Sequence, residues 1–384
     1  NLSYLFRKYI SSCKLFTIFG YCKLVCEQLI LHSVKRIQRM KKIFMFTVVV
    51  IILQKGSAQS FTWGVNATSE VQYNISNGNT NWSSLINMSV DADLWKGAQA
   101  KTEAIITYNL NEKNPIADDL QGYSNINTES RPFRLSIFGI TQQLGKVTVF
   151  AGIRNTGPDY FTSEHTALFT GSSHGIHAPL ANNYEVATYP TAQLCLHTEW
   201  NITKRITLKS SLYNGNPGET IKEQLKINKK IRNISTLSYK ISEEDNGYFC
   251  IGEMTGQNIL NQHAMAIFGI VEYPIIATDH PVLCGILEGA YDNSHILDET
   301  MMCRSYYAAG GVLHLDKTDN RHLGVIVNRA LYINKTKKTH ETDTEITYSQ
   351  SLERCCIQPV LHIIKTGRNY NCIAMLRVMI GINR

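Results

Sequence analysis

The residues whose types could carry out chemistry occur in three short segments of this 384-residue chain. Gly171–Gly175 holds two serines and a histidine, but it neither follows a predicted strand nor opens a helix, as the G-x-S-x-G segment of serine hydrolases does. His197 and Glu199 alternate on a predicted strand without a third metal ligand. Asn214–Gly218 has the composition of a turn rather than of a phosphate-binding loop. The sequence therefore predicts no catalytic, metal or cofactor site, and a protein that is not an enzyme.

The cysteines give no sign of a metal centre or a disulfide framework. Their spacing after residue 58 is irregular, with no C-x-x-C pair and no Cys/His group at zinc spacing. The adjacent Cys355 and Cys356 would point to opposite faces of a strand. We therefore expect mostly unpaired cysteines that fill apolar positions. The seven cysteines concerned are Cys195, Cys250, Cys284, Cys303, Cys355, Cys356 and Cys372.

The elements that must position these residues alternate polar and apolar side chains with a period of two. In 61–75 the odd positions are mostly apolar and the even positions polar, and in 84–94 the parity is reversed. A β-strand turns successive side chains to opposite faces, so each segment has one apolar and one polar face. Asn77–Asn79 between them is a turn signal. The sequence therefore predicts a β-rich fold.

The same alternation predicts sixteen strands, most of them about 9–12 residues long, which is the length that a tilted strand needs to cross a bilayer. One long region without strand character is expected at 155–190, and such loops are usually functional. A helix could begin in 221–230, but the β-rich sequence after it favours an extended segment. The predicted strands are 61–75, 84–94, 100–110, 132–141, 146–154, 191–200, 204–214, 224–236, 246–255, 262–272, 281–291, 304–315, 320–332, 342–353, 354–365 and 372–383.

A soluble sandwich and a transmembrane barrel both accept many alternating strands. A sandwich packs its apolar faces inward, whereas a membrane barrel turns them to lipid and keeps the polar face for a wet lumen. The predicted strands exceed the usual length of about 5–6 residues, and about 16 strands leave a water channel. The sequence therefore predicts an all-β transmembrane antiparallel barrel. Aromatic residues near strand ends fit interfacial girdles or ordinary β-propensity equally well: Phe61, Trp63, Tyr73, Trp95, Tyr108, Trp200 and Tyr213.

The N-terminal part has the features of an export signal that begins at Met40. Met40–Lys42 form a short basic segment, and Ile43–Leu53 is an uncharged run of 11 residues. Gly56–Ala58 then offers small residues before a cut at Gln59. The alternative is a membrane anchor with a cytoplasmic tail, but the apolar run is shorter than the roughly 20 residues of a spanning helix. We therefore expect an exported protein.

The chain is accordingly expected to have three parts: 1–39 as an upstream extension translated in error, 40–58 as the signal peptide, and 59–384 as the barrel domain. Residues 1–58 hold ten of the 38 Lys and Arg residues and one of the 31 acidic residues. Since 28 basic and 30 acidic residues then remain, the net charge of +7 for the whole chain becomes about −2. The basic balance therefore does not indicate nucleic-acid binding.

Distinctive segments follow one another in the second half of the chain: Pro158–Phe161, Ala167–Gly175, Tyr189–Ala192, Leu212–Gly218, Gly310–Val312, His322–Val325, Asn328–Ala330, Glu345–Tyr348 and Ile357–Pro359. Their order and spacing resemble those of the OprB-type carbohydrate-selective porin family. The resemblance covers roughly residues 150–384, and the earlier strands are compatible with it.

This resemblance implies a sixteen-stranded channel in the outer membrane of a Gram-negative bacterium, through which monosaccharides and small oligosaccharides diffuse. A long loop folded into the lumen would form a constriction, where charged and hydroxylated side chains exchange hydrogen bonds with sugar hydroxyls. The implied partners are small sugars as permeants, outer-membrane lipid and the barrel-assembly machinery. A homo-oligomer is left open, and no nucleic acid is expected.

The strand parity nominates residues for such a constriction. Arg134 and Arg154 lie at polar positions of the strands that precede the 155–190 loop, and Glu345 lies on the polar face of a late strand. Opposed basic and acidic groups could set a transverse field across the opening, or they could be merely solvated lumen and loop residues. The loop supplies four further candidates, Asp159, Glu164, His165 and His174.

Three other functions are alternatives to a sugar-selective channel. The first is a general, non-selective porin. The second is an outer-membrane enzyme, such as a lipase or protease built on a barrel, which needs a Ser/His/acid set on the rim that the sequence does not reveal. The third is a secreted β-rich binding protein, which would stay in solution without detergent. Comparing the passage of sugars with that of a size-matched solute separates these classes.

Overall fold

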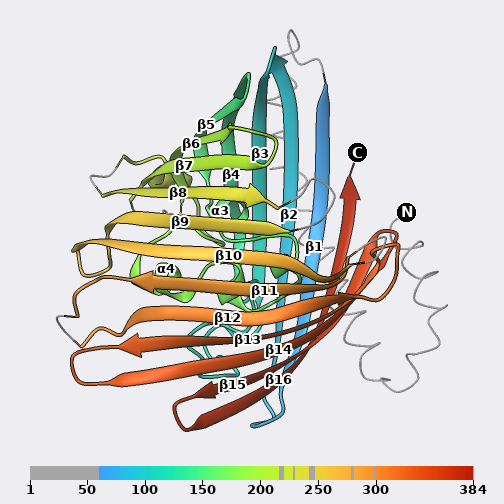
Figure 1. The fold of residues 1–384 in the computed structure, drawn as a ribbon, viewed down its shortest axis with the longest axis vertical. Helices are drawn as coiled ribbons and strands as arrows, with labels where there is room; N and C mark the ends of the chain where they lie inside the picture. The colour runs from blue at the N-terminus through green and yellow to red at the C-terminus, as the bar shows by residue number, and fades with distance from the viewer. Residues whose placement is uncertain are drawn as a thin grey trace. The chain divides into compact units, whose positions relative to one another are not determined.

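The structure, a computed structural model, describes residues 60–215, 220–227, 230–241, 247–277, 281–296 and 299–383. The expected upstream extension and signal peptide lie outside these residues. The described part forms a closed barrel in which every strand is antiparallel to its neighbours along the chain, and β1 pairs with β16 (Figure 1). The predicted sixteen-stranded antiparallel barrel is confirmed.

The strands occupy nearly the positions that the alternation predicts. They are β1 (Phe61–Asn74), β2 (Thr80–Trp95), β3 (Ala98–Asn109), β4 (Arg131–Leu144), β5 (Val147–Arg154), β6 (Gln193–Asn201), β7 (Ile206–Asn214), β8 (Ile231–Lys240), β9 (Tyr248–Gln257), β10 (His263–Ala277), β11 (Pro281–Asp292), β12 (Met302–His314), β13 (Arg321–Ile333), β14 (Lys338–Leu352), β15 (Cys355–Thr366) and β16 (Asn369–Asn383).

The described helices are short. Four of them, α3 (Gly157–Tyr160), η2 (Thr166–Leu168), η3 (Ser172–His174) and α4 (Ala178–Asn183), follow one another between β5 and β6. The fifth, α5 (Ile221–Gln224), precedes β8. Within the described residues, no helix has both the length and the apolar character to span a membrane.

Helix α5 corrects the prediction of an extended segment at 221–230 and of a strand over 224–236. The backbone nitrogen of Thr220 donates to the Glu223 carboxylate at 3.1 Å, and the backbone nitrogen of Glu223 donates to the Thr220 hydroxyl at 3.3 Å. This reciprocal pair is a capping box, which satisfies two donors at the start of a helix. The segment after Thr220 is therefore helical, and β8 begins only at Ile231.

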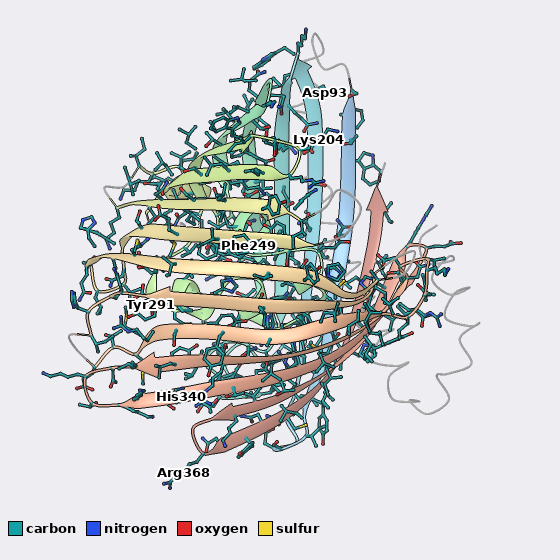
Figure 2. All side chains as sticks on the ribbon, viewed as in Figure 1. Asp93, Lys204, Phe249, Tyr291, His340 and Arg368 are labelled. Atoms are coloured by element: carbon teal, nitrogen blue, oxygen red, sulfur yellow. The ribbon has the colours of Figure 1, made fainter. Side chains whose placement is uncertain are left out.

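The apolar faces of the strands point out of the barrel. On β1, Glu70, Gln72 and Asn74 are fully buried, whereas Val71 and Tyr73 between them are 48% and 45% exposed. Large outward side chains such as Phe249 on β9 and Tyr291 on β11 repeat this pattern (Figure 2). A soluble barrel would have the opposite arrangement, so the surface of this barrel suits lipid.

Some of the aromatic residues near strand ends lie where an interfacial girdle would, and others do not. Phe61, Trp95 and Trp200 lie at strand ends and are 66%, 58% and 45% exposed. Tyr213 is only 2% exposed, because it shares a face with the inward side chain of Ser211 while Leu212 points outward. Of the two interpretations left open for Tyr213, its buried position excludes the girdle.

The two ends of the barrel differ in the length of their connections. The connections after β3 and β5 are long, whereas β2 and β3, β4 and β5, and β14 and β15 are joined at the other end by turns of two residues. Outer-membrane barrels have short turns on the periplasmic side and longer loops outside the cell. The long connections therefore mark the extracellular end.

Candidate pore constriction

Two long loops fold into the barrel, loop 110–130 between β3 and β4 and loop 155–192 between β5 and β6. The expected in-folded loop is thus present, but 155–190 is not the single long non-strand region that the sequence suggested. Helix α4 of loop 155–192 packs against β11 and β12, which lie in front of it in Figure 1. The two loops together narrow the lumen.

Loop 155–192 covers an apolar patch on the inner wall. Phe161 and Leu180 of the loop are completely buried, and they belong to one cluster with wall residues such as Phe268, Ile286 and Ile326. This patch departs from the uniformly polar inner face that strand parity suggested. Burial of apolar side chains on both surfaces stabilises the loop inside the barrel.

Three glutamates of the wall hold the loops through backbone amides. Glu272 on β10 accepts hydrogen bonds from the nitrogens of His165 and Thr166, at 2.9 and 3.0 Å. Glu345 on β14 accepts from those of Thr170 and Gly171, at 2.8 and 3.0 Å. Glu341, also on β14, accepts from the nitrogens of Leu120 and Gln121, at 2.7 and 2.8 Å. Hydrogen bonds to a carboxylate are stronger than neutral ones, so these residues act as anchors.

Histidines provide further links between loop 155–192 and the wall. His165 Nδ1 lies 3.0 Å from Glu272 Oε2, and His174 Nδ1 lies 2.7 Å from Glu288 Oε2 on β11. Burial alone would lower the pKa of His174, but the Glu288 carboxylate more than offsets this and raises the pKa above its usual value. The Glu288 carboxylate therefore favours the protonated form of His174.

Three residues predicted to line the constriction, His165, His174 and Glu345, are instead buried at the junction of loop 155–192 with the wall. His165 contacts Glu272, His174 contacts Glu288, and Glu345 accepts from the nitrogen of Thr170. They hold the loop in place and do not line open solvent.

The predicted residues Arg154 and Asp159 form a pair at the start of loop 155–192. The Arg154 guanidinium makes two hydrogen bonds of 2.5 Å to the two Asp159 oxygens. Lys209 on β7 donates to the Asp159 carbonyl oxygen at 3.2 Å and lies 3.8 Å from the Glu199 carboxylate on β6. The side chains of Lys209 and Glu199 are 25% and 33% exposed, whereas those of Arg154 and Asp159 are mostly buried, so only part of this group of alternating charges faces solvent inside the barrel.

The two other candidates do not join this group. Arg134 on β4 is 6% exposed, with Nη1 lying 3.5 Å from the carbonyl oxygen of Pro190. Glu164 is exposed on loop 155–192. The predicted charges therefore divide into loop anchors, one mostly buried ion pair, a buried arginine and an exposed loop residue.

Sequence reasoning missed several charges on the same inner face. Glu199 and Lys209 were not nominated, and neither were Asp91 on β2 and Lys101 on β3, whose charged atoms lie 3.6 Å apart with both side chains about one-third exposed. Strand parity could have found them, because Asp91 and Lys101 are register partners with the inward orientation of Glu70 and Ser83.

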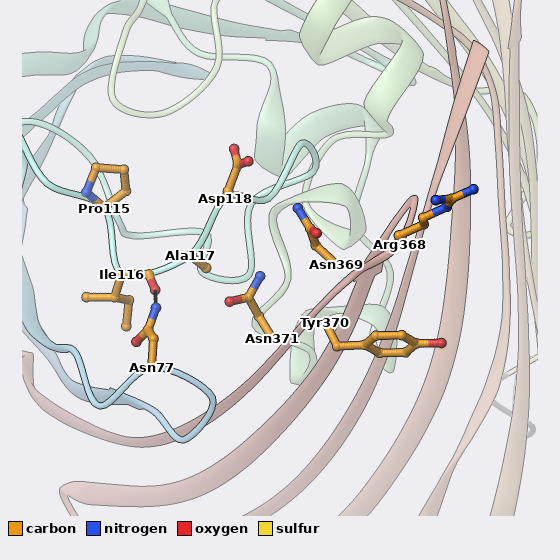
Figure 3. A pocket seen from close by; sticks show the side chains of 9 residues that line it. All are labelled: Asn77, Pro115, Ile116, Ala117, Asp118, Arg368, Asn369, Tyr370 and Asn371. Atoms are coloured by element: carbon orange, nitrogen blue, oxygen red, sulfur yellow. Dashed lines mark hydrogen bonds between the residues drawn. The ribbon is translucent and has the colours of Figure 1, made fainter.

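A cavity of about 570 Å³ lies at the extracellular end, between loop 110–130 and the hairpins that join β1 to β2 and β15 to β16. The Asn77 amide donates to the Ile116 carbonyl oxygen at 3.0 Å and closes one side of it (Figure 3). Asp118, Arg368 and Asn371 are among its polar lining residues. The cavity therefore offers donors and acceptors where a solute would enter.

One carboxylate within loop 110–130, that of Asp119, makes the stability of the folded protein depend on pH. Burial, together with the nearby Glu341 carboxylate, raises the pKa of Asp119 to about 7. The folded protein therefore binds this proton more readily than the unfolded chain does, and stability is lost as the pH rises towards 7. Between pH 6 and pH 8 we expect the free energy of unfolding to fall by about 1 kcal/mol from this group.

Denaturant unfolding of the wild type and Asp119→Asn in lipid vesicles at both pH values tests this. Asparagine keeps the oxygen that accepts from the Tyr123 nitrogen at 2.7 Å but cannot ionise. The wild type should lose stability relative to the variant as the pH rises. Parallel pH profiles for the two proteins would show that Asp119 is not the responsible group.

A sixteen-stranded membrane barrel with a charged lumen narrowed by in-folded loops defines a porin, the class of water-filled diffusion channels. The model of the family described as carbohydrate-selective porins, OprB family, matches residues 76–354. The chain therefore belongs to the OprB family of carbohydrate-selective porins, and it is a porin of the Gram-negative outer membrane. A search of curated proteins finds no match.

Solved porin structures share the fold. The high-pH structure of OprB from Pseudomonas putida has a TM-score of 0.70 and 14% sequence identity, and the match covers 87% of this chain and 96% of that chain. The low-pH structure has a TM-score of 0.55 and 13% identity, over 87% and 95%. The anion-selective porin from Comamonas acidovorans has a TM-score of 0.54 and 11% identity, over 84% and 99%. At these identities the likeness establishes the fold.

Proposed function

We propose that this porin lets monosaccharides and small oligosaccharides diffuse past a constriction inside the barrel. The wall anchors set the width of this constriction. Its selectivity for sugars comes from the group Arg154, Asp159, Glu199 and Lys209. The observation that carries the proposal is the placement of this group, whose members Glu199 and Lys209 are partly exposed, beside the start of the anchored loop. Donors and acceptors alternate within it, which suits a solute that carries both on neighbouring hydroxyls.

Passage would proceed by exchange of hydrogen bonds. A sugar that enters the narrow part sheds some of its water, and the charged side chains replace the lost hydrogen bonds. The polar cavity at the extracellular end would receive the sugar first. Binding must stay weak, because a site that held the sugar tightly would slow its release.

The permeant would pass unchanged. The segment Gly171–Gly175, which contains serines and a histidine, is engaged in anchoring: the Gly171 nitrogen donates to Glu345, and His174 contacts Glu288 and the Tyr306 hydroxyl. These contacts favour a structural role for the segment over that of a hydrolase nucleophile. They support a channel over the barrel-enzyme alternative.

Liposome swelling tests the proposed function. The purified protein is refolded, reconstituted into liposomes and exposed to glucose, maltose and a net-neutral amino acid of similar size to glucose. The proposal predicts faster swelling with glucose than with the size-matched solute. Equal rates would favour a general porin, and a protein that gives no swelling and stays soluble without detergent would favour the secreted binding protein.

Removing the Lys209 charge should weaken sugar selectivity without opening the pore. Lys209→Gln removes a cationic donor that faces solvent, and one hydrogen bond contributes about 0.5–1.5 kcal/mol. We therefore expect glucose entry relative to the size-matched solute to fall by about two- to tenfold. Lys338→Gln, at an exposed position at the start of β14, is the matched control. If the ratio of glucose entry to entry of the size-matched solute is the same in both variants, Lys209 does not contribute to sugar selectivity.

A further inference from the structure

Three side chains with metal-binding atoms meet where loop 155–192 touches the wall near the periplasmic end. His165 comes from the loop, Cys284 from β11 and His314 from the end of β12. One ring nitrogen of each histidine and the Cys284 sulfur all lie within 4.8 Å of one another. Cys284 is completely buried, and His165 and His314 are 3% and 9% exposed. The three residues are far apart in sequence, which is why their spacing gave no sign of a metal site.

The second ring nitrogen of each histidine contacts a carboxylate. His165 Nδ1 lies 3.0 Å from Glu272 Oε2, and His314 Nδ1 lies 2.7 Å from Asp319 Oδ1. A carboxylate at Nδ1 keeps the proton on that nitrogen, and the Nε2 atom of the neutral ring then carries a lone pair. This arrangement is the usual outer shell of a metal-bound histidine.

The two Nε2 atoms point at each other across 3.1 Å. Two lone pairs at this distance repel unless a cation lies between them, and that cation is either a proton or a metal ion. Two nitrogens that each bind zinc at about 2.0–2.1 Å in a tetrahedron are roughly 3.3 Å apart. The observed separation is close to this value, and the neighbouring thiol adds a ligand that favours a soft metal over a proton.

We propose that His165 Nε2, His314 Nε2 and Cys284 Sγ bind one Zn²⁺ ion, which fastens loop 155–192 to β11 and β12. Thiolate and imidazole are the ligands that select zinc over magnesium or calcium. The ion would displace the proton from the thiol and any proton shared between the histidines. A fourth coordination position is left for water. Zinc would thus add a second link between the loop and the wall at His165, whose backbone nitrogen already donates to Glu272.

Titration with Co²⁺, which takes the place of Zn²⁺ and absorbs light, tests this proposal. The full protein is refolded under reducing conditions in detergent, and its barrel is verified by heat-dependent migration in a gel. We expect one equivalent of Co²⁺ to give the visible bands of a tetrahedral site and a thiolate-to-cobalt charge-transfer band in the near ultraviolet. Added Zn²⁺ should abolish both. The absence of these bands in the folded wild type would overturn the proposal, and this result needs no variant.

Variants then assign the ligands. His165→Gln, His314→Gln and Cys284→Ser should each weaken Co²⁺ binding at least tenfold, and Cys284→Ser should also abolish the charge-transfer band. His263→Gln, at an exposed position on β10, and Cys372→Ser on β16 are the matched controls and should bind like the wild type. An unchanged spectrum in Cys284→Ser, or equal losses in the controls, would contradict the assignment. Because the assay measures no transport, its outcome is independent of sugar passage.

Discussion

Glu345→Ala is expected to release the middle of loop 155–192 and to raise the single-channel conductance. The Glu345 carboxylate accepts from the Thr170 and Gly171 nitrogens and from the Thr170 hydroxyl, at 2.8 to 3.0 Å, and it is completely buried. Alanine leaves these donors without their anionic acceptor. Leaving a buried donor unsatisfied costs about 1–3 kcal/mol, and with several such donors this is enough to favour opening of this part of the loop.

Conductance in planar bilayers and hydrogen exchange of residues 169–175 check the effect. The variant should conduct more current, with larger fluctuations, and the loop amides should exchange faster. Glu345→Gln keeps one acceptor oxygen and should give a smaller effect, and Glu164→Ala at an exposed position of the same loop is the control. A Glu345→Ala channel with wild-type conductance and wild-type exchange would show that the carboxylate does not set the opening.

Glu70→Ala is expected to destabilise closure of the barrel. Glu70 on β1 and Arg377 on β16 are register partners across the closing strand pair, and Arg377 Nε donates to Glu70 Oε1 at 2.6 Å. Both side chains are buried. The pair also reaches loop 110–130, because Ser124 donates to Glu70 and Arg377 donates to Asn125, both at 2.6 Å. Alanine leaves the guanidinium buried without its partner, at a cost of about 3–5 kcal/mol.

Denaturant unfolding in lipid vesicles measures this cost. The double variant Glu70→Met and Arg377→Met removes both charges, and similar replacements of buried ion pairs are often neutral or stabilising. We therefore expect the double variant to recover most of the lost free energy of unfolding. A single variant within about 0.5 kcal/mol of the wild type, or a double variant that is no better than the single one, would contradict the role of this pair in closure.

The strands could be predicted from sequence because their alternation is a local property. Lipid outside and water inside impose opposite polarity on adjacent residues, so parity in a single strand such as β1 already identifies its two faces. The same rule, applied strictly, would also have placed Tyr213 inside, since Leu208 and Leu212 define the outer face of β7. The capping box Thr220–Glu223 before β8 is a local signal as well, and it could have predicted α5.

The anchors could not be predicted in this way, because they depend on the path of the loops. Glu345 lies 175 positions after Thr170, and Glu272 lies 107 positions after His165. Parity shows that these carboxylates face inward, but it does not show which backbone amides they meet. Loop 110–130 was overlooked as an in-folded loop for the same reason, since its contact with Glu341 spans about half the chain.

Sugar-selective passage is tested most directly by the effect of glucose on the ionic current through a single wild-type channel in a planar bilayer. Glucose that pauses at the charged constriction should reduce the current reversibly, and more than a poly(ethylene glycol) of equal size, which enters by size alone. The difference should shrink in Glu345→Ala, where the released loop no longer sets the width. Equal reductions by both solutes in the wild type, or the absence of any current, would contradict a sugar-selective channel.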